Sequence, residues 1–182
     1  MSAQDRLQEG VLVLRCQVGD REAFAELVGR YHRPLRYFIG QLSDSTEMAE
    51  DIEQNTWLTA IEKIGSLRNA GSLTPWLYRI ARNAAYQQLR KKRKPVEFRD
   101  DLMPSEESHE AEFSPKDAAR IHAELKRLSP EHREVMTLRF LEELSYEQVA
   151  EVVGCGVNTV KSRIHYAKLA LKKALEESHG KK

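Results

Sequence analysis

A run of basic residues in the first half of the chain has the composition of a nucleic-acid contact. RIARNAAYQQLRKKRK, from Arg79 to Lys94, holds seven basic side chains and no acid, although the whole chain has a formal net charge of only +1. Arginine and lysine bind phosphates, whereas asparagine, glutamine and tyrosine hydrogen-bond to nucleobases or stack on them. The residues expected to contact nucleic acid are Arg79, Arg82, Asn83, Tyr86, Gln87, Arg90, Lys91 and Arg93, and Tyr78 and Gln88 belong to the same pattern.

Two alternatives compete with this interpretation of the run. One is an ordinary solvated helix face, but such a face usually mixes acids and bases at i,i+4 spacing, which gains about 0.2–0.5 kcal/mol per pair. The other is a basic amphipathic helix on a membrane surface, which needs apolar residues that face the lipid. Trp76 and Leu77 are expected in the protein core instead. Nucleic-acid binding is therefore the interpretation that we follow.

A second basic block lies near the end of the chain, after a short turn that contains glycine. Asn158 to Lys173 holds five basic residues and no acid, and Gly154 and Gly156 bracket the turn. A short helix, a tight turn and a basic second helix are typical of a helix-turn-helix, whose second helix reads base edges in the major groove. The residues expected to contact DNA here are Asn158, Thr159, Lys161, Ser162, Arg163, His165 and Lys168.

Acidic and amide side chains gather on the outer face of another expected helix. They are Glu47, Glu50, Asp51, Glu53 and Gln54. Their directions around the helix differ and no matching histidine accompanies them, so we expect no metal site here. An acidic face of this kind suits a basic partner protein.

No catalytic or redox centre is expected from the remaining reactive side chains. Cys16 and Cys155 lie far apart and at no metal-ligand spacing, so we interpret both as packing residues, with a redox-sensing Cys155 as the alternative. The motifs assemble no Ser-His-Asp, Cys-His or convergent carboxylate set. The chain is therefore expected to have no enzyme activity, no cofactor and no metal.

Amphipathic helices are expected to position these groups in the first half. Apolar residues three and four apart from Ala23 to Leu42 predict one helix, and Asp20 stands where its N-cap is needed. A second helix is expected to begin near Asp44, which forms a capping-box-like pair with Glu47. Its apolar side is formed by Ala49, Ile52, Thr56, Ala60 and Ile64.

The basic run falls on a third helix, which follows a loop. Thr74 is the expected N-cap and Pro75 the first helical residue, where no backbone N–H is needed. The loop before it, Gly65 to Leu73, is rich in serine, asparagine and glycine.

The second half repeats this organisation with shorter helices. Ser129 and Pro130 predict the start of a helix, and Ser145 with Gln148 forms a capping box for the first helix of the helix-turn-helix. The helix that starts at Ser129 and Pro130 is expected to hold Val135, Leu138 and Leu141. The apolar stripe of the basic helix is formed by Val160, Ile164, Ala167 and Leu171.

The two halves are separated by an acidic segment. Residues 95–117 contain eight acids, two bases and three prolines, which is the composition of a flexible linker. No sustained period-two alternation predicts a strand. We therefore expect an all-α protein with two small helical domains, residues 1–94 and 118–182, joined by the linker 95–117. The longest apolar run near the start, Val11 to Leu14, is too short for a signal peptide or a membrane span, so a cytoplasmic protein without membrane insertion is expected.

Four segments in order resemble the extracytoplasmic-function (group 4) sigma factors of the bacterial RNA polymerase sigma-70 family. The opening helix of region 2 is matched by GDREAFAELVGRYHRPLRYFI, and the region 2.2 helix by AEDIEQNTWLTAIEKI. Regions 2.3 and 2.4 are matched by TPWLYRIARNAAYQQLRKKRK, and region 4 by LKRLSPEHREVMTLRFLEELSYEQVAEVVGCGVNTVKSRIHYAKLAL. The similarity covers nearly the whole chain except the linker and the ends.

The resemblance implies a role for each group of residues. Glu50, Asp51 and Gln54 would bind the clamp coiled coil of the polymerase β′ subunit. The basic run from Arg79 would open and read the −10 promoter element, and the residues from Asn158 to Lys168 would read the −35 element, with the first helices of that domain against the β flap. The loop before the basic run would capture a base flipped from the non-template strand, through Ser66, Arg68, Asn69 and Ser72.

These implications give one expected function and two alternatives. The expected function is a promoter-specificity subunit that binds core RNA polymerase and promoter DNA, and members of the family are often held by an anti-sigma factor. A stand-alone regulator that uses only the helix-turn-helix is the first alternative, but it leaves the first half of the chain without a role. A hydrolase or nuclease is the second, and no catalytic set supports it.

Overall fold

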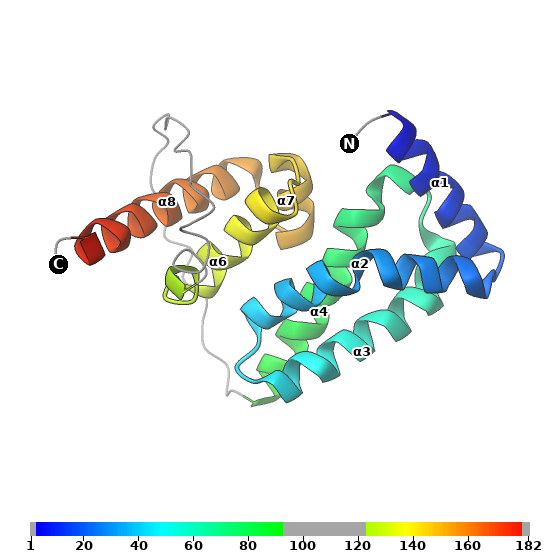
Figure 1. Cartoon of the computed structure of the whole chain (residues 1–182), viewed down its shortest axis with the longest axis horizontal. Helices are drawn as coiled ribbons and strands as arrows, with labels where there is room; N and C mark the ends of the chain where they lie inside the picture. Colours follow the sequence, from blue (N-terminus) through cyan, green and yellow to red (C-terminus); the bar gives the residue numbers. More distant parts are fainter. Residues whose placement is uncertain (1–2, 93–122, 180–182) are drawn as a thin grey trace. The chain divides into compact units, whose positions relative to one another are not determined.

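The computed structural model describes residues 3–92 and 123–179, and within these two ranges the regular structure is helical, without strands. The chain divides into two compact units, Met1–Val96 and Glu97–Lys182 (Figure 1). The expectation of an all-α fold is confirmed. The linker 95–117 and the first residues of the expected second domain lie outside the described residues.

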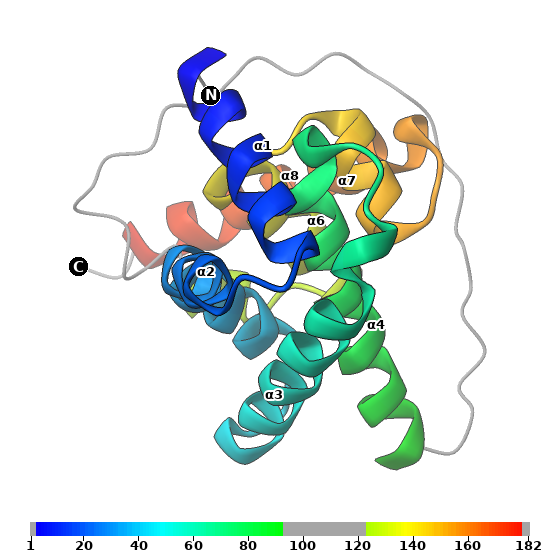
Figure 2. The same ribbon diagram turned by 90° about the vertical axis from the view of Figure 1, so that its right-hand side faces the viewer.

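Unit 1 is a bundle of four helices with two short turns between the third and the fourth. Its elements are α1 (Ala3–Gln17), α2 (Arg21–Leu42), α3 (Thr46–Lys63), the 3-10 turns η1 (Ile64–Ser66) and η2 (Ala70–Ser72), and α4 (Leu73–Lys92). Helix α2 packs against α1, α3 and α4, and α3 also packs along α4 (Figure 2). The side chains of Leu27, Leu35, Phe38, Ile39, Ile52, Leu73, Leu77 and Tyr78 are fully buried in this core.

The helix starts of unit 1 agree with the sequence in one case and differ in two. Asp20 caps α2, as expected, by accepting hydrogen bonds from the N–H groups of Glu22 and Ala23. Helix α3 is capped by Ser45, whose side chain accepts from the N–H of Met48, so the expected start at Asp44 is one residue too early. Thr74 does not cap α4, because the η2 turn leads directly into a helix that begins at Leu73.

A further difference is α1 itself, which the sequence analysis did not predict. Its apolar residues occupy more than one face: Leu12 and Val13 are buried, whereas Leu7, Val11, Leu14 and Val18 at and just after the helix are 50–84% exposed. The buried side of α1 also includes an acid, Glu9. The apolar spacing therefore does not mark one stripe, and the periodicity that indicates the other helices is missing here.

Unit 2 contains the expected helix-turn-helix. Its elements are α6 (Pro130–Met136), the π-helical turn η4 (Thr137–Leu141), α7 (Tyr146–Val153) and α8 (Val157–His179). Ser129 caps α6, and Ser145 and Gln148 form a complete capping box at the start of α7, both as predicted. Gly154 ends α7 with φ of 71°, a left-handed conformation that glycine adopts without strain. The predicted apolar stripe of α8 is confirmed, since Val160, Ile164, Ala167 and Leu171 are buried.

The π-helical turn changes the end of the helix that begins at Pro130. The N–H of Glu142 donates to the carbonyl of Thr137, five residues earlier, at 3.2 Å. A π turn adds a residue to the helical repeat and rotates the side chains that follow it. Leu138 stays buried, but Phe140 and Leu141 are 43% and 46% exposed. Of the apolar residues expected on this helix, Leu141 is therefore partly exposed.

Candidate nucleic-acid interface

Helix α4 places the polar and basic residues of the first basic run on one face. Arg79, Asn83, Tyr86 and Arg90 follow each other at spacings of four, three and four, so their side chains lie above one another along the helix. Arg82 lies next to this group, and its guanidinium lies over the Tyr86 ring, 4.5 Å from the centroid. A cation held on an aromatic face leaves a flat surface on which a base can stack.

The residues of the basic run on α4 differ in how exposed they are to solvent. Asn83, Gln87, Arg90 and Lys91 are exposed, whereas Arg79, Arg82, Tyr86 and Gln88 are half-buried, and Arg93 lies outside the described residues. Tyr78 is fully buried, with its ring 5.1 Å from the ring of Phe38 in edge-to-face contact. The expectation that Tyr78 shares the nucleic-acid face is therefore wrong, because an aromatic ring at this helical position points into the core.

The loop before α4 is more ordered than its composition suggests. Two 3-10 turns occupy it, and the side chain of Asn69 caps the second by accepting from the N–H of Gly71 at 3.0 Å. The Ser66 hydroxyl donates to the carbonyl of Lys63 at 2.7 Å. Ser66, Arg68 and Asn69 are exposed and Ser72 is half-buried, so three of the four expected base-capture residues are open to a ligand.

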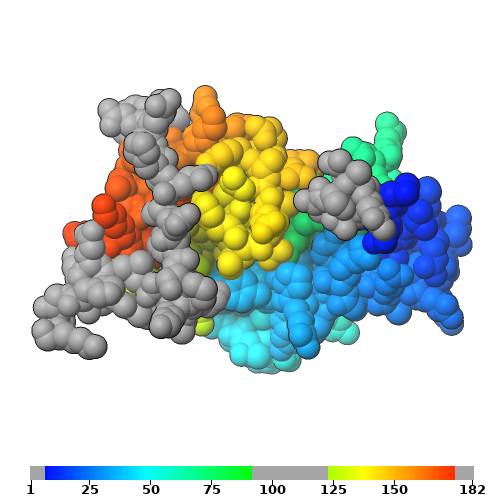
Figure 3. Space-filling view, turned by 45° about the horizontal axis from the view of Figure 1, so that its top comes forward, coloured from blue at the N-terminus to red at the C-terminus, as the bar shows by residue number. Residues whose placement is uncertain are grey.

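The outer face of α3 carries the expected acid and amide. Asp51 and Gln54 are exposed, and Glu50 is exposed but paired with Arg36, whose Nη2 lies 2.9 Å from its carboxylate. Figure 3 shows the neighbouring outer surfaces of α2, in blue, and α3, in cyan. These side chains form a surface of mixed charge where α2 and α3 meet.

Glu53 does not belong to this outer face. Its carboxylate is only 8% exposed and lies 2.6 Å from Nδ1 of His32 and 3.4 Å from Nη1 of Arg36. A buried carboxylate needs such partners, because leaving it unpaired costs several kcal/mol. The prediction of an exposed Glu53 is wrong, and its role is to tie α3 to α2.

Two exposed apolar residues on α3 were missed from the sequence. Leu58 and Ile61 are 53% and 52% exposed, and they continue the face of Asp51 and Gln54 at spacings of four and three. The sequence did indicate that they are exposed, since neither Leu58 nor Ile61 falls on the apolar stripe from Ala49 to Ile64. The face of α3 is thus polar at one end and apolar at the other.

The start of α8 presents the expected DNA-contacting residues. Asn158 and Lys161 are exposed, and Thr159, Ser162, Arg163, His165 and Lys168 are half-buried. Neighbouring aromatic rings support two of the cations: Nζ of Lys161 lies 5.8 Å from the centroid of Tyr146, and Nζ of Lys168 lies 5.0 Å from that of Phe140. The rings of Tyr146 and Phe140 therefore hold these two cations close to the helix surface.

Arg163 is half-buried beside the turn of the helix-turn-helix. Its Nη1 lies 4.0 Å from Sγ of Cys155, and its charge acts on His132 of α6. Burial lowers the pKa of His132 below its ordinary value, Glu131 opposes this and Arg163 adds to it.

Cys155 is half-buried and Cys16 is buried, and burial raises the pKa of the Cys16 thiol. Neither cysteine forms a disulfide in the described ranges.

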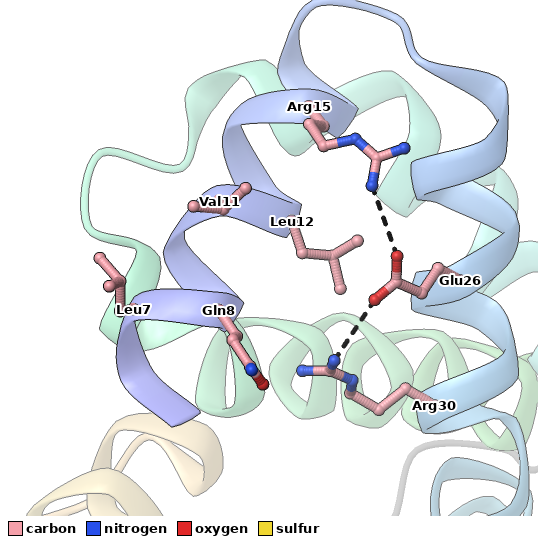
Figure 4. A pocket seen from close by; sticks show the side chains of 7 residues that line it. All are labelled: Leu7, Gln8, Val11, Leu12, Arg15, Glu26 and Arg30. Atoms are coloured by element: carbon pink, nitrogen blue, oxygen red, sulfur yellow. Dashed lines mark hydrogen bonds and ion pairs between the residues drawn. The ribbon is translucent and has the colours of Figure 1, made fainter. Parts of the chain in front are cut away.

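Side chains that could bind a metal ion do not cluster in the described parts of the chain. Residues 3–92 and 123–179 contain no group of three His, Cys, Asp or Glu side chains that could hold a metal ion. The hollow between α1 and α2 is lined by Leu7, Val11 and Leu12 and by an ion-pair chain in which Glu26 bridges Arg15 and Arg30 (Figure 4). Asp20 also pairs with Arg15, so the two cations are matched by two carboxylates.

The two units define a class: an all-helical protein with a basic helix in each unit, one of them in a helix-turn-helix. Comparison with known families identifies both. The model of sigma-70 region 2 matches residues 27–94, and the model of sigma-70 region 4 matches residues 118–171.

Curated relatives extend the match over nearly the whole chain. The RNA polymerase sigma-H factor of Pseudomonas aeruginosa is 32% identical, with 93% of this chain and 94% of the relative covered. The ECF RNA polymerase sigma-E factor of Escherichia coli is 33% identical, covering 92% and 94%. The ECF RNA polymerase sigma factor SigW of Bacillus subtilis is 30% identical, covering 87% and 92%. The chain belongs to the extracytoplasmic-function sigma factors of the sigma-70 family.

Solved structures share the fold. The sigma factor RpoE from Bartonella quintana, solved in complex with the anti-sigma factor NepR, has a TM-score of 0.66 at 30% identity and covers 84% of this chain and 96% of its own. CnrH, solved in complex with the cytosolic domain of CnrY, has a TM-score of 0.68 at 23% identity, covering 92% and 96%. In the described ranges, no helix is both long and apolar enough to cross a membrane.

Proposed function

We propose that this sigma factor binds core RNA polymerase through the outer face of α3 and recognises promoters with α4 and α8. The observation that carries the proposal is the presence of one cation-bearing helix face in each of two separate helical units. The members of the sigma-70 family are the specificity subunits of RNA polymerase, and promoter-directed initiation is the function of this chain.

The polymerase contact is assigned to Glu50, Asp51 and Gln54, extended by Leu58 and Ile61. Interfaces gain most of their free energy from apolar side chains that become fully buried, while charged residues at the rim give orientation. The exposed face of α3 provides two apolar residues that can be buried and an acid and an amide that can orient the partner. The Arg36 ion pair fixes the direction of the Glu50 carboxylate.

Recognition of the −10 element is assigned to α4 and the loop before it. The residues assigned to base edges or base faces are Arg79, Arg82, Asn83, Tyr86 and Gln87. The phosphates are assigned to Arg90, Lys91 and Arg93, which do not read sequence. Ser66, Arg68, Asn69 and Ser72 form the proposed site for a base flipped out of the duplex. Flipping costs a few kcal/mol, which a polar site for the base offsets.

Recognition of the −35 element is assigned to the N-terminal part of α8. Asn158, Thr159, Lys161 and Ser162 occupy the positions that a recognition helix inserts first into the major groove. Arg163, His165 and Lys168 follow over the next two turns. In this arrangement residues 1–94 form the polymerase-binding and −10 domain, residues 118–182 form the −35 domain, and residues 95–117 connect them.

Three further properties follow from this function. The protein acts in the cytoplasm, where core polymerase and promoter DNA are found, and it has no catalytic centre of its own. Core polymerase, with its β′ clamp coiled coil and β flap, and promoter DNA are its main partners. An anti-sigma factor is a further partner, by analogy with the RpoE relative that was solved in such a complex.

In vitro transcription with purified core polymerase tests the proposal. Fragmented genomic DNA serves as template, and the 5′ ends of the transcripts are mapped with and without the sigma factor. We expect a defined set of start sites that share two upstream elements and are absent with core alone. If the free chain binds the same DNA tightly and no new start site appears with core, the protein is a stand-alone regulator instead.

A further inference from the structure

The loop between α3 and α4 is held by a residue far away in sequence. Gln17, the last residue of α1, donates from its side-chain Nε2 to the carbonyl of Ile64 at 3.0 Å and to the carbonyl of Leu67 at 2.8 Å. Both carbonyls belong to the first 3-10 turn of the loop, where the N–H of Leu67 also donates to Ile64. In Figures 1 and 2 this blue-green connection passes beside the end of α1.

The other end of the loop is also tied to α1. The Tyr31 hydroxyl donates to the buried carboxylate of Glu9 at 2.5 Å and lies 3.0 Å from the hydroxyl of Thr74, the second residue of α4. The Thr74 hydroxyl is itself 3.5 Å from the Glu9 carboxylate. Glu9 and Tyr31 are 3% and 9% exposed, so this cluster is shielded from water. It fixes the start of α4 against α1 and α2.

Helix packing accompanies these two ties. Helix α1 contacts η2, and a Cβ placed on Gly10 would be 3.8 Å from Cβ of Ala70, which is an ordinary van der Waals distance. Helix α1 therefore contacts the loop region at three points. Gln17 contacts the first turn, Gly10 contacts the second turn, and Glu9 contacts the start of α4. The exposed side chains of Arg68 and Asn69 lie between these supported points.

We propose that α1 is a positioning element for the base-capture loop, with Gln17 as its main contact. This inference rests on the proposed role of residues 64–72 in −10 recognition. A loop that is already fixed loses less conformational entropy when it binds a base, and it presents the same polar groups to each base. Gln17 thus contributes to base discrimination without touching DNA. Residues 3–17 lie outside the matched region 2 segment, 27–94.

The test compares two substitutions at position 17 with one at position 8. Gln17→Met keeps the length of the side chain and removes the N–H donors, while Gln17→Lys keeps a donor that reaches the same carbonyls. Gln8→Ala is the matched control, because Gln8 is an exposed glutamine of the same helix that lines the hollow between α1 and α2 (Figure 4). Thr74→Val loosens the other end of the loop.

The probe is a pool of single-stranded DNA 12-mers, randomised over about six positions, that is selected on holoenzyme assembled from core polymerase and each full-length variant. Sequencing of the bound fraction gives the preference for each base at each position. In Gln17→Met we expect the strongest preference to fall by about three- to tenfold for each hydrogen bond lost. Gln17→Lys should restore it in part, Gln8→Ala should equal the wild type, and affinity for core should be unchanged throughout.

The outcomes separate this inference from the function on which it rests. If the wild-type holoenzyme selects no base, the proposed base capture itself is wrong. If the wild type selects and both Gln17→Met and Thr74→Val select equally well, α1 does not position the loop. A loss in Gln17→Met that is matched by an equal loss in core affinity shows a general folding defect and also overturns the inference. Loss of preference with intact core binding in either loop variant supports it.

Discussion

Asp51 is the side chain whose substitution most directly tests polymerase binding. It is exposed on α3 and lies one turn from Gln54 and two from Leu58, on a face that packs against no other part of unit 1 that is described. Asp51→Ala should weaken binding to core polymerase by about three- to tenfold, as expected for a rim charge with one partner, and should leave thermal stability unchanged. Fluorescence titration of labelled sigma factor with core measures the affinity.

The control for Asp51 is another exposed acid, Glu22, in the first turn of α2. Glu22→Ala removes the same charge from a different helix and should bind core like the wild type. The start sites used in transcription should be the same for both variants. If Asp51→Ala changes promoter choice rather than core affinity, the assignment of this face is incorrect.

His132 predicts how the stability of unit 2 depends on pH. Its pKa is lowered in the folded state, chiefly by burial, and an unfolded histidine has a pKa of about 6.5. Between these values the unfolded chain binds more protons than the folded one, so the free energy of unfolding decreases as the pH falls through about 6.5. His132→Gln should remove this part of the pH dependence. Urea denaturation at pH 7.5 and 5.5, compared between wild type and variant, measures it.

At the level of single residues, sequence identifies the chemistry of a side chain better than its direction. The exposed Asn83, Gln87 and Lys161 were predicted, whereas Glu53 and Tyr78 were placed on surfaces although both are buried. The amphipathic pattern alone could not predict that Glu53 and Tyr78 are buried. Glu53 is buried because His32 and Arg36 of another helix pair with it, and that contact depends on the tertiary fold.

The capping box at the start of α7 determines where the helix-turn-helix begins. The Ser145 side chain accepts from the N–H of Gln148 at 3.2 Å, and the Gln148 side chain accepts from the N–H of Ser145 at 2.9 Å. Ser145→Ala should lower the free energy of unfolding of unit 2 by about 1 kcal/mol, because it leaves an N–H of the first turn without its acceptor. Ser145→Asp keeps an acceptor and should be close to neutral.

Chemical denaturation followed by a probe in unit 2 measures these changes. An equal loss in Ser145→Ala and Ser145→Asp would show that the hydroxyl has a role other than capping.

At the level of elements, three of the five expected N-caps were predicted correctly, and helix registers were predicted less well. Asp20, Ser129 and the Ser145 capping box act as predicted, because each depends only on residues a few positions away. Phe140 and Leu141 turn outward because a π turn adds a residue, and no local pattern indicates that turn. Helix α1 was missed because its apolar residues do not form a single stripe.

For the whole molecule, the proposed assignment of one promoter element to each domain predicts that residues 95–117 limit how far apart the two elements can be. These twenty-three residues span at most about 80 Å when fully extended. Deleting residues 97–108 leaves eleven, which reach about 40 Å, little more than one turn of DNA at about 34–36 Å. We expect the deletion to reduce initiation at promoters that need both elements while core binding is kept. In vitro transcription from templates with shortened spacers between the elements measures this effect.

A control variant distinguishes length from charge. Replacing residues 97–108 by a Gly-Ser sequence of equal length restores the reach but removes acids, and it should restore initiation. If the deletion initiates normally on unaltered promoters, the reach of this segment does not limit the two contacts. If only the Gly-Ser variant fails, the acidic character is what matters.

The tie from Gln17 to the turn at Ile64 and Leu67 also has a consequence for protein engineering. Ile64 and Leu67 lie 47 and 50 residues after Gln17 in the chain. A graft that exchanges only the segment between α3 and α4 therefore separates these two residues from their original residue 17. A chimera made to transfer the promoter preference of one relative to another should therefore exchange α1 together with that segment. Residue 17 can then be chosen to suit the backbone of the donor loop.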